Sequence, residues 1–159
     1  MNRRLALSAL AALGFAALSA ALPALAADPA ISGTWDLDIA KSKSTDPMPT
    51  SITRSYEVTG TSEKLTGTIV TADGKSIPIN FTATLDGKDS PFQSPGVDAL
   101  ALTKVDALTV TYVTKLAGKQ VATGNRVLSA DGRTMTFNQK GLTPVGAPFE
   151  STMVYGRRQ

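Results

Sequence analysis

From residue 31 onward, apolar side chains recur at every second position, and this alternation restricts the fold more than any other feature. In the clearest run, residues 77–85, apolar side chains occupy the odd positions and proline or polar residues occupy the even ones. A period of two places alternate side chains on opposite faces of a β-strand, and no window sustains the spacing of an amphipathic helix. We therefore expect an all-β protein.

Similar runs predict about nine strands. They cover residues 33–39, 51–58, 62–71, 76–85, 99–105, 107–114, 119–129, 133–140 and 148–157. Asp-Gly pairs at 73–74, 86–87 and 131–132 favour tight hairpin turns because these residues tolerate positive φ. Alternation that persists to the last run favours closure. We predict a single antiparallel up-and-down β-barrel of about 8–10 strands, with residues 86–98 as a loop or lid over its mouth.

Residues 1–26 have the three parts of a secretory signal peptide. Two arginines begin it, residues 5–22 are uncharged, and Ala24-Leu25-Ala26 offers a small-x-small cleavage site. We predict cleavage after Ala26, a mature domain of residues 27–159, and export to the periplasm or beyond. A retained membrane anchor is the alternative interpretation of residues 5–22, and the alanine content and the cleavage site disfavour it.

Composition excludes several functional classes. The chain has no histidine and no cysteine, which excludes Ser-His-Asp and Cys-His catalysis, histidine-held haem, disulfides and the usual zinc sites. Two of the 16 basic residues lie in the predicted signal peptide, which leaves 14 against 13 acidic residues. They are scattered along the chain, so we expect no nucleic-acid binding. We also expect no metal, no cofactor, a monomer, and no stable membrane insertion after cleavage.

The two ends of the predicted domain carry a recognisable pattern. Gly33-Thr34-Trp35 opens the first predicted strand, and Arg157-Arg158 lies at the end of the last. This resembles the lipocalin and calycin superfamily, in which Gly-x-Trp opens the first strand and a late arginine packs across the indole. The resemblance implies that Gly33, Trp35 and Arg157 form a structural plug at the closed end of the barrel, with Arg158 as the alternate partner. Guanidinium over indole is a favourable cation–π arrangement.

More narrowly, the chain from residue 31 to its end is similar to small secreted bacterial lipocalin-like proteins of uncharacterised function. The shared features are the GTW opening, AKSK at 40–43, DGKD at 86–89 and the Ser-x-Asp-Gly-Arg-Thr hairpin at 129–134. This resemblance implies a lipocalin-like barrel without an established ligand. Fatty-acid-binding relatives carry Arg-x-Tyr in the final strand, whereas this chain has Tyr155-Gly156-Arg157, the reverse order.

The predicted interior contains residues that could line a ligand site. A barrel of this size is either filled by its own side chains or holds one small ligand. Small residues at interior positions favour incomplete filling, although they equally suit a flattened barrel. The candidate ligand-binding residues are Arg54, Tyr56, Phe81, Tyr112, Phe149 and Met153.

Arg54 is the most informative of these candidates. It shares a strand face with Ile52, Tyr56 and Val58, and a buried arginine needs a partner. With Tyr56 it could hold the polar end of a ligand; alternatively a bulge interrupts the strand, or the side chain reaches the rim. Arg126 is out of phase with its apolar neighbours, so we expect it to point outward.

Three functional hypotheses follow. The leading one is an exported, non-catalytic barrel that binds a small apolar or amphipathic ligand in its interior. The alternative is an envelope protein-interaction module or protease-inhibitor-like barrel that acts through its rim loops, with residues 86–98 as the contact surface. The third is an enzyme that uses carboxylates or Tyr and Arg. Asp36 and Asp38 are expected to face solvent, opposite the core residues Trp35, Leu37 and Ile39, so they are not predicted to be catalytic.

Overall fold

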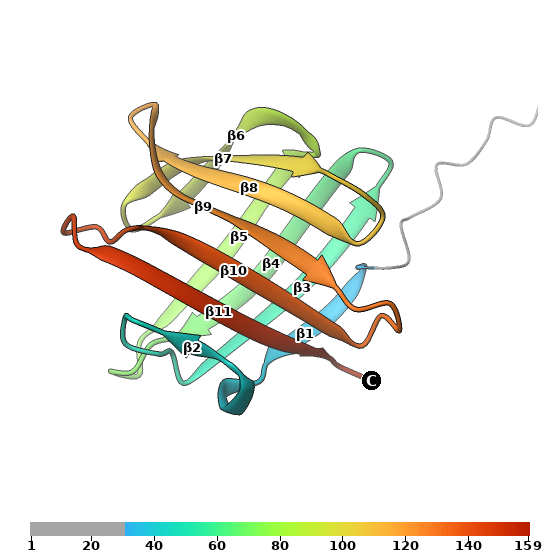
Figure 1. Cartoon of the computed structure of the whole chain (residues 1–159), viewed down its shortest axis with the longest axis horizontal. Helices are drawn as coiled ribbons and strands as arrows, with labels where there is room; N and C mark the ends of the chain where they lie inside the picture. Colours follow the sequence, from blue (N-terminus) through green and yellow to red (C-terminus); the bar gives the residue numbers. More distant parts are fainter. Residues whose placement is uncertain (1–30) are drawn as a thin grey trace, which may run out of the picture.

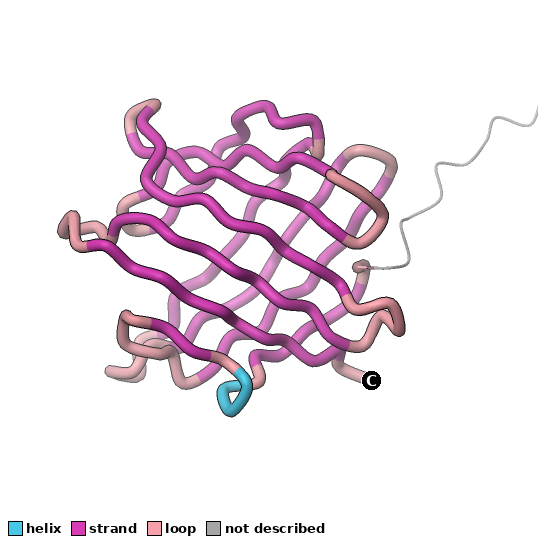
Figure 2. Tube along the Cα trace, viewed as in Figure 1, coloured by secondary structure: helices cyan, strands magenta, loops and turns pink. Residues whose placement is uncertain are grey.

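A computed structural model describes residues 31–159 as a nearly closed antiparallel β-barrel (Figure 1). The predicted signal peptide, its cleavage point and residues 27–30 lie outside the described residues. Strands make up most of the described chain, as Figure 2 shows. They are β1 (Gly33–Leu37), β2 (Lys43–Ser44), β3 (Ser51–Thr59), β4 (Ser62–Val70), β5 (Ser76–Thr84), β6 (Asp86–Ser94), β7 (Val97–Lys104), β8 (Thr109–Leu116), β9 (Lys119–Leu128), β10 (Thr134–Leu142) and β11 (Pro148–Arg157). Within this range no helix is long and apolar enough to cross a membrane.

The strands form one sheet that curls back on itself. Ten of them follow the order β5-β4-β3-β1-β11-β10-β9-β8-β7-β6, and β2 pairs with β11 beside this path. Within residues 31–159 all neighbouring strands pair antiparallel, so the predicted all-β antiparallel barrel is confirmed. Within residues 31–159 no ladder joins the two ends of the path, β5 and β6. Across this seam the rings of Phe81 and Phe92 meet edge to face, with centroids 5.5 Å apart.

The prediction of a loop or lid at residues 86–98 is wrong. β6 occupies Asp86–Ser94 and pairs with β7, with register shifts between Asp86 and Asp89 and between Pro91 and Ser94. Because β6 is an edge strand, it tolerates bulges and a proline that has no N–H to donate. This polar segment therefore forms an irregular edge strand. The protein-interaction alternative assumed a contact loop here, and the segment does not form one.

Only two of the three Asp-Gly pairs occupy hairpin turns. Gly74 and Gly132 have φ of +80° and +67° in the turns after β4 and β9. The third pair lies inside β6, because Leu85 alone connects β5 to β6. The two-residue turn with positive φ at both positions is Ala117-Gly118, between β8 and β9, where the sequence offers no Asp-Gly signal.

The first strand ends two residues earlier than predicted. At Asp38 the chain turns into the 3₁₀ helix η1 (Ile39–Lys41), and the Asp38 carboxylate accepts a hydrogen bond from the backbone N–H of Lys41 at 3.2 Å. Ile39, which alternation assigned to the core, is consequently 46% exposed. The chain then runs beside β11 as β2, where the backbone N–H of Val154 donates to Ser42 Oγ at 2.9 Å.

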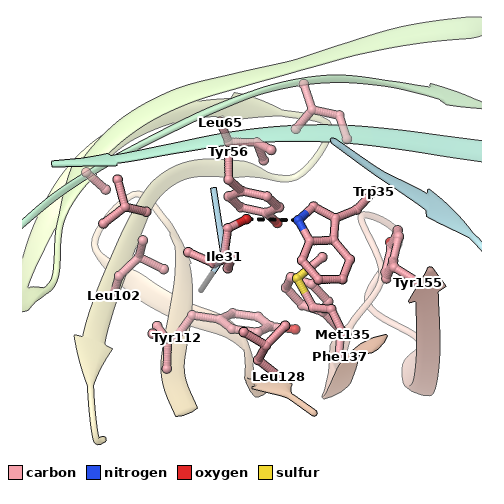
Figure 3. Packing of buried hydrophobic residues seen from close by; sticks show 14 of the residues in the cluster. Ile31, Trp35, Tyr56, Leu65, Leu102, Tyr112, Leu128, Met135, Phe137 and Tyr155 are labelled. Atoms are coloured by element: carbon pink, nitrogen blue, oxygen red, sulfur yellow. Dashed lines mark hydrogen bonds between the residues drawn. The ribbon is translucent and has the colours of Figure 1, made fainter. Parts of the chain in front are cut away.

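Trp35 lies in the packed end of the barrel. Its side chain is fully buried, and its indole N–H donates to the carbonyl of Ile31 at 2.9 Å (Figure 3). Near it the structure leaves a cavity of only about 20 Å³, whose lining includes Ile31, Val58 and Leu128. This end, which we call the closed end, is therefore filled by side chains.

Candidate ligand-binding site

The opposite end of the barrel contains a cavity of about 470 Å³, which we call the mouth cavity. It lies between the connection from η1 to β3 and the turn from β4 to β5. Its lining residues are Pro47, Pro49, Ile52, Arg54, Ile69, Thr71, Ala72, Asp73, Phe137, Gln139, Met153 and Tyr155. Most of this wall is apolar.

A second cavity of about 110 Å³, the inner cavity, lies nearer the closed end. Its lining residues are Arg54, Tyr56, Glu63, Leu65, Ile79, Phe81, Phe92, Leu100, Leu102, Val110, Tyr112, Thr114, Arg126, Phe137 and Gln139. Figure 3 shows five of these side chains, Tyr56, Leu65, Leu102, Tyr112 and Phe137, in the interior of the barrel. The two cavities share Arg54, Phe137 and Gln139, so these three side chains form the boundary between them.

Arg54 points inward from β3 at this boundary. Its Cζ lies 4.6 Å from the ring centroid of Phe137 and 5.2 Å from that of Tyr155. Its Nη1 donates to Tyr56 Oη at 3.3 Å, whereas its Nε is buried and has no hydrogen-bond partner among residues 31–159. Of the alternatives for Arg54, the structure therefore shows the interior position.

Arg126 is also inside the barrel, so the prediction that it points outward is wrong. It is 6% exposed, and it forms two 2.7 Å hydrogen bonds with the carboxylate of the fully buried Glu63. The inward face of β9 includes Ala122, Arg126 and Leu128, whereas Val127 lies on the outward face. The prediction for Arg126 was wrong because it assumed that the valines of this strand face inward. The paired charges satisfy each other in the interior.

Besides Tyr56, two further tyrosines supply hydroxyl groups near Arg54. Tyr112 Oη donates to Gln139 Oε1 at 2.9 Å, and Tyr155 Oη is buried without a hydrogen-bond partner in the described chain. Desolvation by burial raises the pKa of both phenols above the ordinary value of 10, so both stay protonated at neutral pH. Each can act as a hydrogen-bond donor.

Five of the six predicted ligand-binding residues meet at these cavities. Arg54 lines both cavities, Tyr56, Phe81 and Tyr112 line the inner one, and Met153 lines the mouth. Phe149 lines neither of them; it borders a separate groove near the rim, formed with residues 120–123 and 140–142.

The further lining residues that were missed from the sequence include Glu63, Phe92, Gln139 and Tyr155. Glu63 shares a strand face with Leu65, which is a signal for an interior position. Tyr155 likewise alternates with Met153. Phe92 lay in the segment predicted as a loop.

The predicted plug residues lie together at the closed end. The Cζ of Arg157 is 4.3 Å from the Trp35 ring centroid. Its Nη1 donates to the carbonyl of Ser32 at 2.7 Å and its Nε to that of Gly132 at 2.8 Å. Gly33 has φ +127°, and a Cβ there would lie 2.9 Å from Arg157 Nη1. Glycine thus leaves room for the guanidinium.

The carboxylates near β1 lie away from both cavities. Asp36 forms an ion pair with Arg158, and Asp38 forms one with Lys41 at 2.7 Å. The hydrogen bond from Arg158 lowers the pKa of Asp36 below its ordinary value. Among residues 31–159 no group of three His, Cys, Asp or Glu side chains is arranged to hold a metal ion.

No protein-family model matches this chain, and no curated protein matches it. Among solved structures it is similar to the crystal structure of zebrafish ileal bile acid-binding protein in complex with cholic acid. The sequence identity is 10% and the TM-score is 0.50, over 81% of this chain and 99% of that one. At this identity the similarity shows the fold alone, a nearly closed antiparallel β-barrel. The narrower resemblance to secreted bacterial proteins stays a prediction.

Proposed function

We propose that this protein is a carrier that binds one small apolar or amphipathic molecule in the open half of its barrel. The observation that supports this most is the mouth cavity of about 470 Å³, which falls within the roughly 300–1,000 Å³ of small-molecule sites. Its wall combines apolar side chains such as Ile52, Ile69 and Met153 with few polar groups, and this combination is typical of such sites.

The body of the ligand occupies the mouth cavity. The inner cavity, at about 110 Å³, is below the usual size of a ligand pocket and can take only a small group. Side chains fill the closed end beyond it. The solved barrel that this chain resembles was crystallised with cholic acid, and that complex makes interior binding a reasonable function for this fold.

The carrier acts without catalysis. Glu63, the carboxylate that lines the inner cavity, is bound to Arg126 through both of its oxygens. Both oxygens therefore already accept hydrogen bonds from Arg126, and Glu63 is not positioned to act as a general base toward a substrate. We further propose that the protein is exported as a monomer after cleavage at Ala26; amino-terminal sequencing of the secreted fraction tests this by the residue it finds first.

Binding of the neutral dye Nile red tests the carrier function. The wild-type protein is expected to enhance dye fluorescence saturably, and Met153→Trp to weaken binding at least tenfold because the indole fills the mouth cavity. Val105→Trp is the matched control, since Val105 is 59% exposed at the closed end. Native mass spectrometry of the purified protein is expected to show a co-purifying small molecule. The proposal fails if Nile red does not bind and no small molecule is retained.

A further inference from the structure

We propose that the ligand is a carboxylate, and that its charged group binds Arg54 at the boundary of the two cavities while its apolar part lies toward the mouth. This inference rests on the proposed function, because it assigns the chemical class and the orientation of the molecule held at that site. Four observations support it: the charge balance of the interior, the donors that lack partners, the geometry around the guanidinium and the sizes of the cavities.

The lining of the inner cavity carries one more positive charge than negative, and Asp73 at the mouth cavity is paired with Lys75. Arg54 and Arg126 both line the inner cavity, whereas Glu63 is the carboxylate among its lining residues. Both oxygens of Glu63 are bound to Arg126, so Arg54 forms no ion pair within residues 31–159. A guanidinium removed from water without a counter-charge is costly, and an anionic ligand would supply that charge.

Hydrogen-bond donors without partners cluster at the same place. Nη1 of Arg54 is bound to Tyr56, but the buried Nε has no hydrogen-bond partner within the described residues, which leaves the edge formed by Nε and Nη2 open to a ligand. The Tyr155 hydroxyl, which lies near Arg54 and whose ring Arg54 contacts, is likewise buried without a hydrogen-bond partner of regular geometry in residues 31–159. One guanidinium edge presents two parallel N–H groups, which match the two oxygens of a carboxylate. The protonated Tyr155 hydroxyl would add a third donor.

Aromatic rings hold the guanidinium in position before a ligand binds. The ring centroids of Phe137 and Tyr155 lie 4.6 and 5.2 Å from Arg54 Cζ. These contacts favour the charged form and restrict the side chain without using its N–H groups. A donor that is fixed in advance loses less conformational entropy when an anion binds.

The sizes of the two cavities set the orientation. Arg54 borders both, and the cavity on its closed-end side holds only about 110 Å³. An alkyl chain or ring system therefore has room only on the mouth side, against Ile52, Ile69 and Met153. The carboxylate enters first, and the apolar body extends from Arg54 toward the opening.

Calorimetric titration with three probes of equal chain length, decanoate, decan-1-ol and decylamine, tests this inference at neutral pH and low salt. In the wild type we expect decanoate to bind at least tenfold more tightly than decan-1-ol, and decylamine to bind most weakly. Arg54→Met should reduce the preference for decanoate over decan-1-ol to about one, because Met keeps the apolar length and removes the charge. Arg133→Met is the matched control, since this exposed arginine carries the same charge outside the barrel.

The outcomes separate the two proposals. If none of the three probes binds the wild type, the carrier function itself fails. If decan-1-ol binds as tightly as decanoate, or if Arg54→Met retains the preference, interior binding stands and the carboxylate assignment is wrong. If circular dichroism shows that Arg54→Met does not fold, the order of affinities of the wild type for the three probes tests the carboxylate assignment. Tyr155→Phe gives a second test, because this variant is expected to weaken decanoate binding severalfold.

Discussion

Replacing Arg54 by methionine should stabilise the ligand-free protein, although the same change should abolish carboxylate binding. Bringing an unpaired charge into the interior costs several kcal/mol even after relaxation. The contacts with Phe137 and Tyr155 each stabilise the folded protein by about 0.5–2 kcal/mol, and the 3.3 Å hydrogen bond to Tyr56 contributes about 1 kcal/mol. Arg54 is only partly buried and borders two cavities. We therefore expect Arg54 to destabilise the ligand-free protein by a net amount of only about 1–2 kcal/mol.

Urea unfolding measures this change directly. The chain has a single tryptophan, and Trp35 is fully buried, so its fluorescence reports on the closed end. The protein should be unfolded and refolded first to remove retained ligand. Arg54→Met is expected to raise the free energy of unfolding by about 1–2 kcal/mol, which corresponds to a rise in Tm of roughly 3–10 °C.

Arg126→Met is the matched comparison, because it removes the other interior arginine. It should lower the free energy of unfolding by about 3–5 kcal/mol, since it leaves the buried carboxylate of Glu63 without its partner. The two variants should therefore change stability in opposite directions. If Arg54→Met destabilises the ligand-free protein as Arg126→Met does, then Arg54 is compensated within the chain, and the reasoning from unbalanced charge is refuted.

Three further predictions concern the frame around the site. Trp35→Ala should lower the free energy of unfolding by about 3–5 kcal/mol, as expected for a fully buried indole; circular dichroism melts would show it, and an unchanged Tm would contradict the plug assignment. Gly124→Ala should cost roughly 1–3 kcal/mol, because the added Cβ would clash with the Asn138 carbonyl and lie 2.6 Å from Tyr112 Oη; decanoate affinity should fall with it. The folded-state pKa of Asp36 lies below its ordinary 3.8, so its ion pair with Arg158 stabilises above about pH 4 and loses this contribution as the pH falls through the folded-state pKa. Asp36→Asn should flatten the acid side of the stability profile, and an unaltered profile would show that this pair contributes nothing measurable.

The strands with one buried and one solvent-exposed face were predictable from the sequence. β5 was expected at 76–85 and spans Ser76–Thr84, because its inward Ile79 and Ala83 alternate with polar neighbours that face water. β6 lacks that pattern. As an edge strand with two register shifts and a proline, it obeys neither strict alternation nor complete pairing, so its sequence is indistinguishable from that of a loop.

The candidate site was predictable only in part. The aromatic wall residues followed from strand phase, whereas the partner of Arg126 did not, because Glu63 is distant in sequence and charged residues are normally assigned to the surface. The state of Arg54 depends on which carboxylates reach it in three dimensions. A sequence can place an arginine on an inward face, but it does not reveal that the nearby acid is already bound to another arginine.

The seam between β5 and β6 has a consequence for hydrogen exchange. Each of these strands has a ladder partner on one side only, and Phe81 and Phe92 bridge the seam through ring contact. Amide groups facing the seam should exchange with deuterium faster than those of β10 or β11, which are paired on both sides along part of their length. The barrel can thus open locally along this line while the remaining strands stay paired, so its least protected region adjoins the inner cavity that Phe81 and Phe92 line.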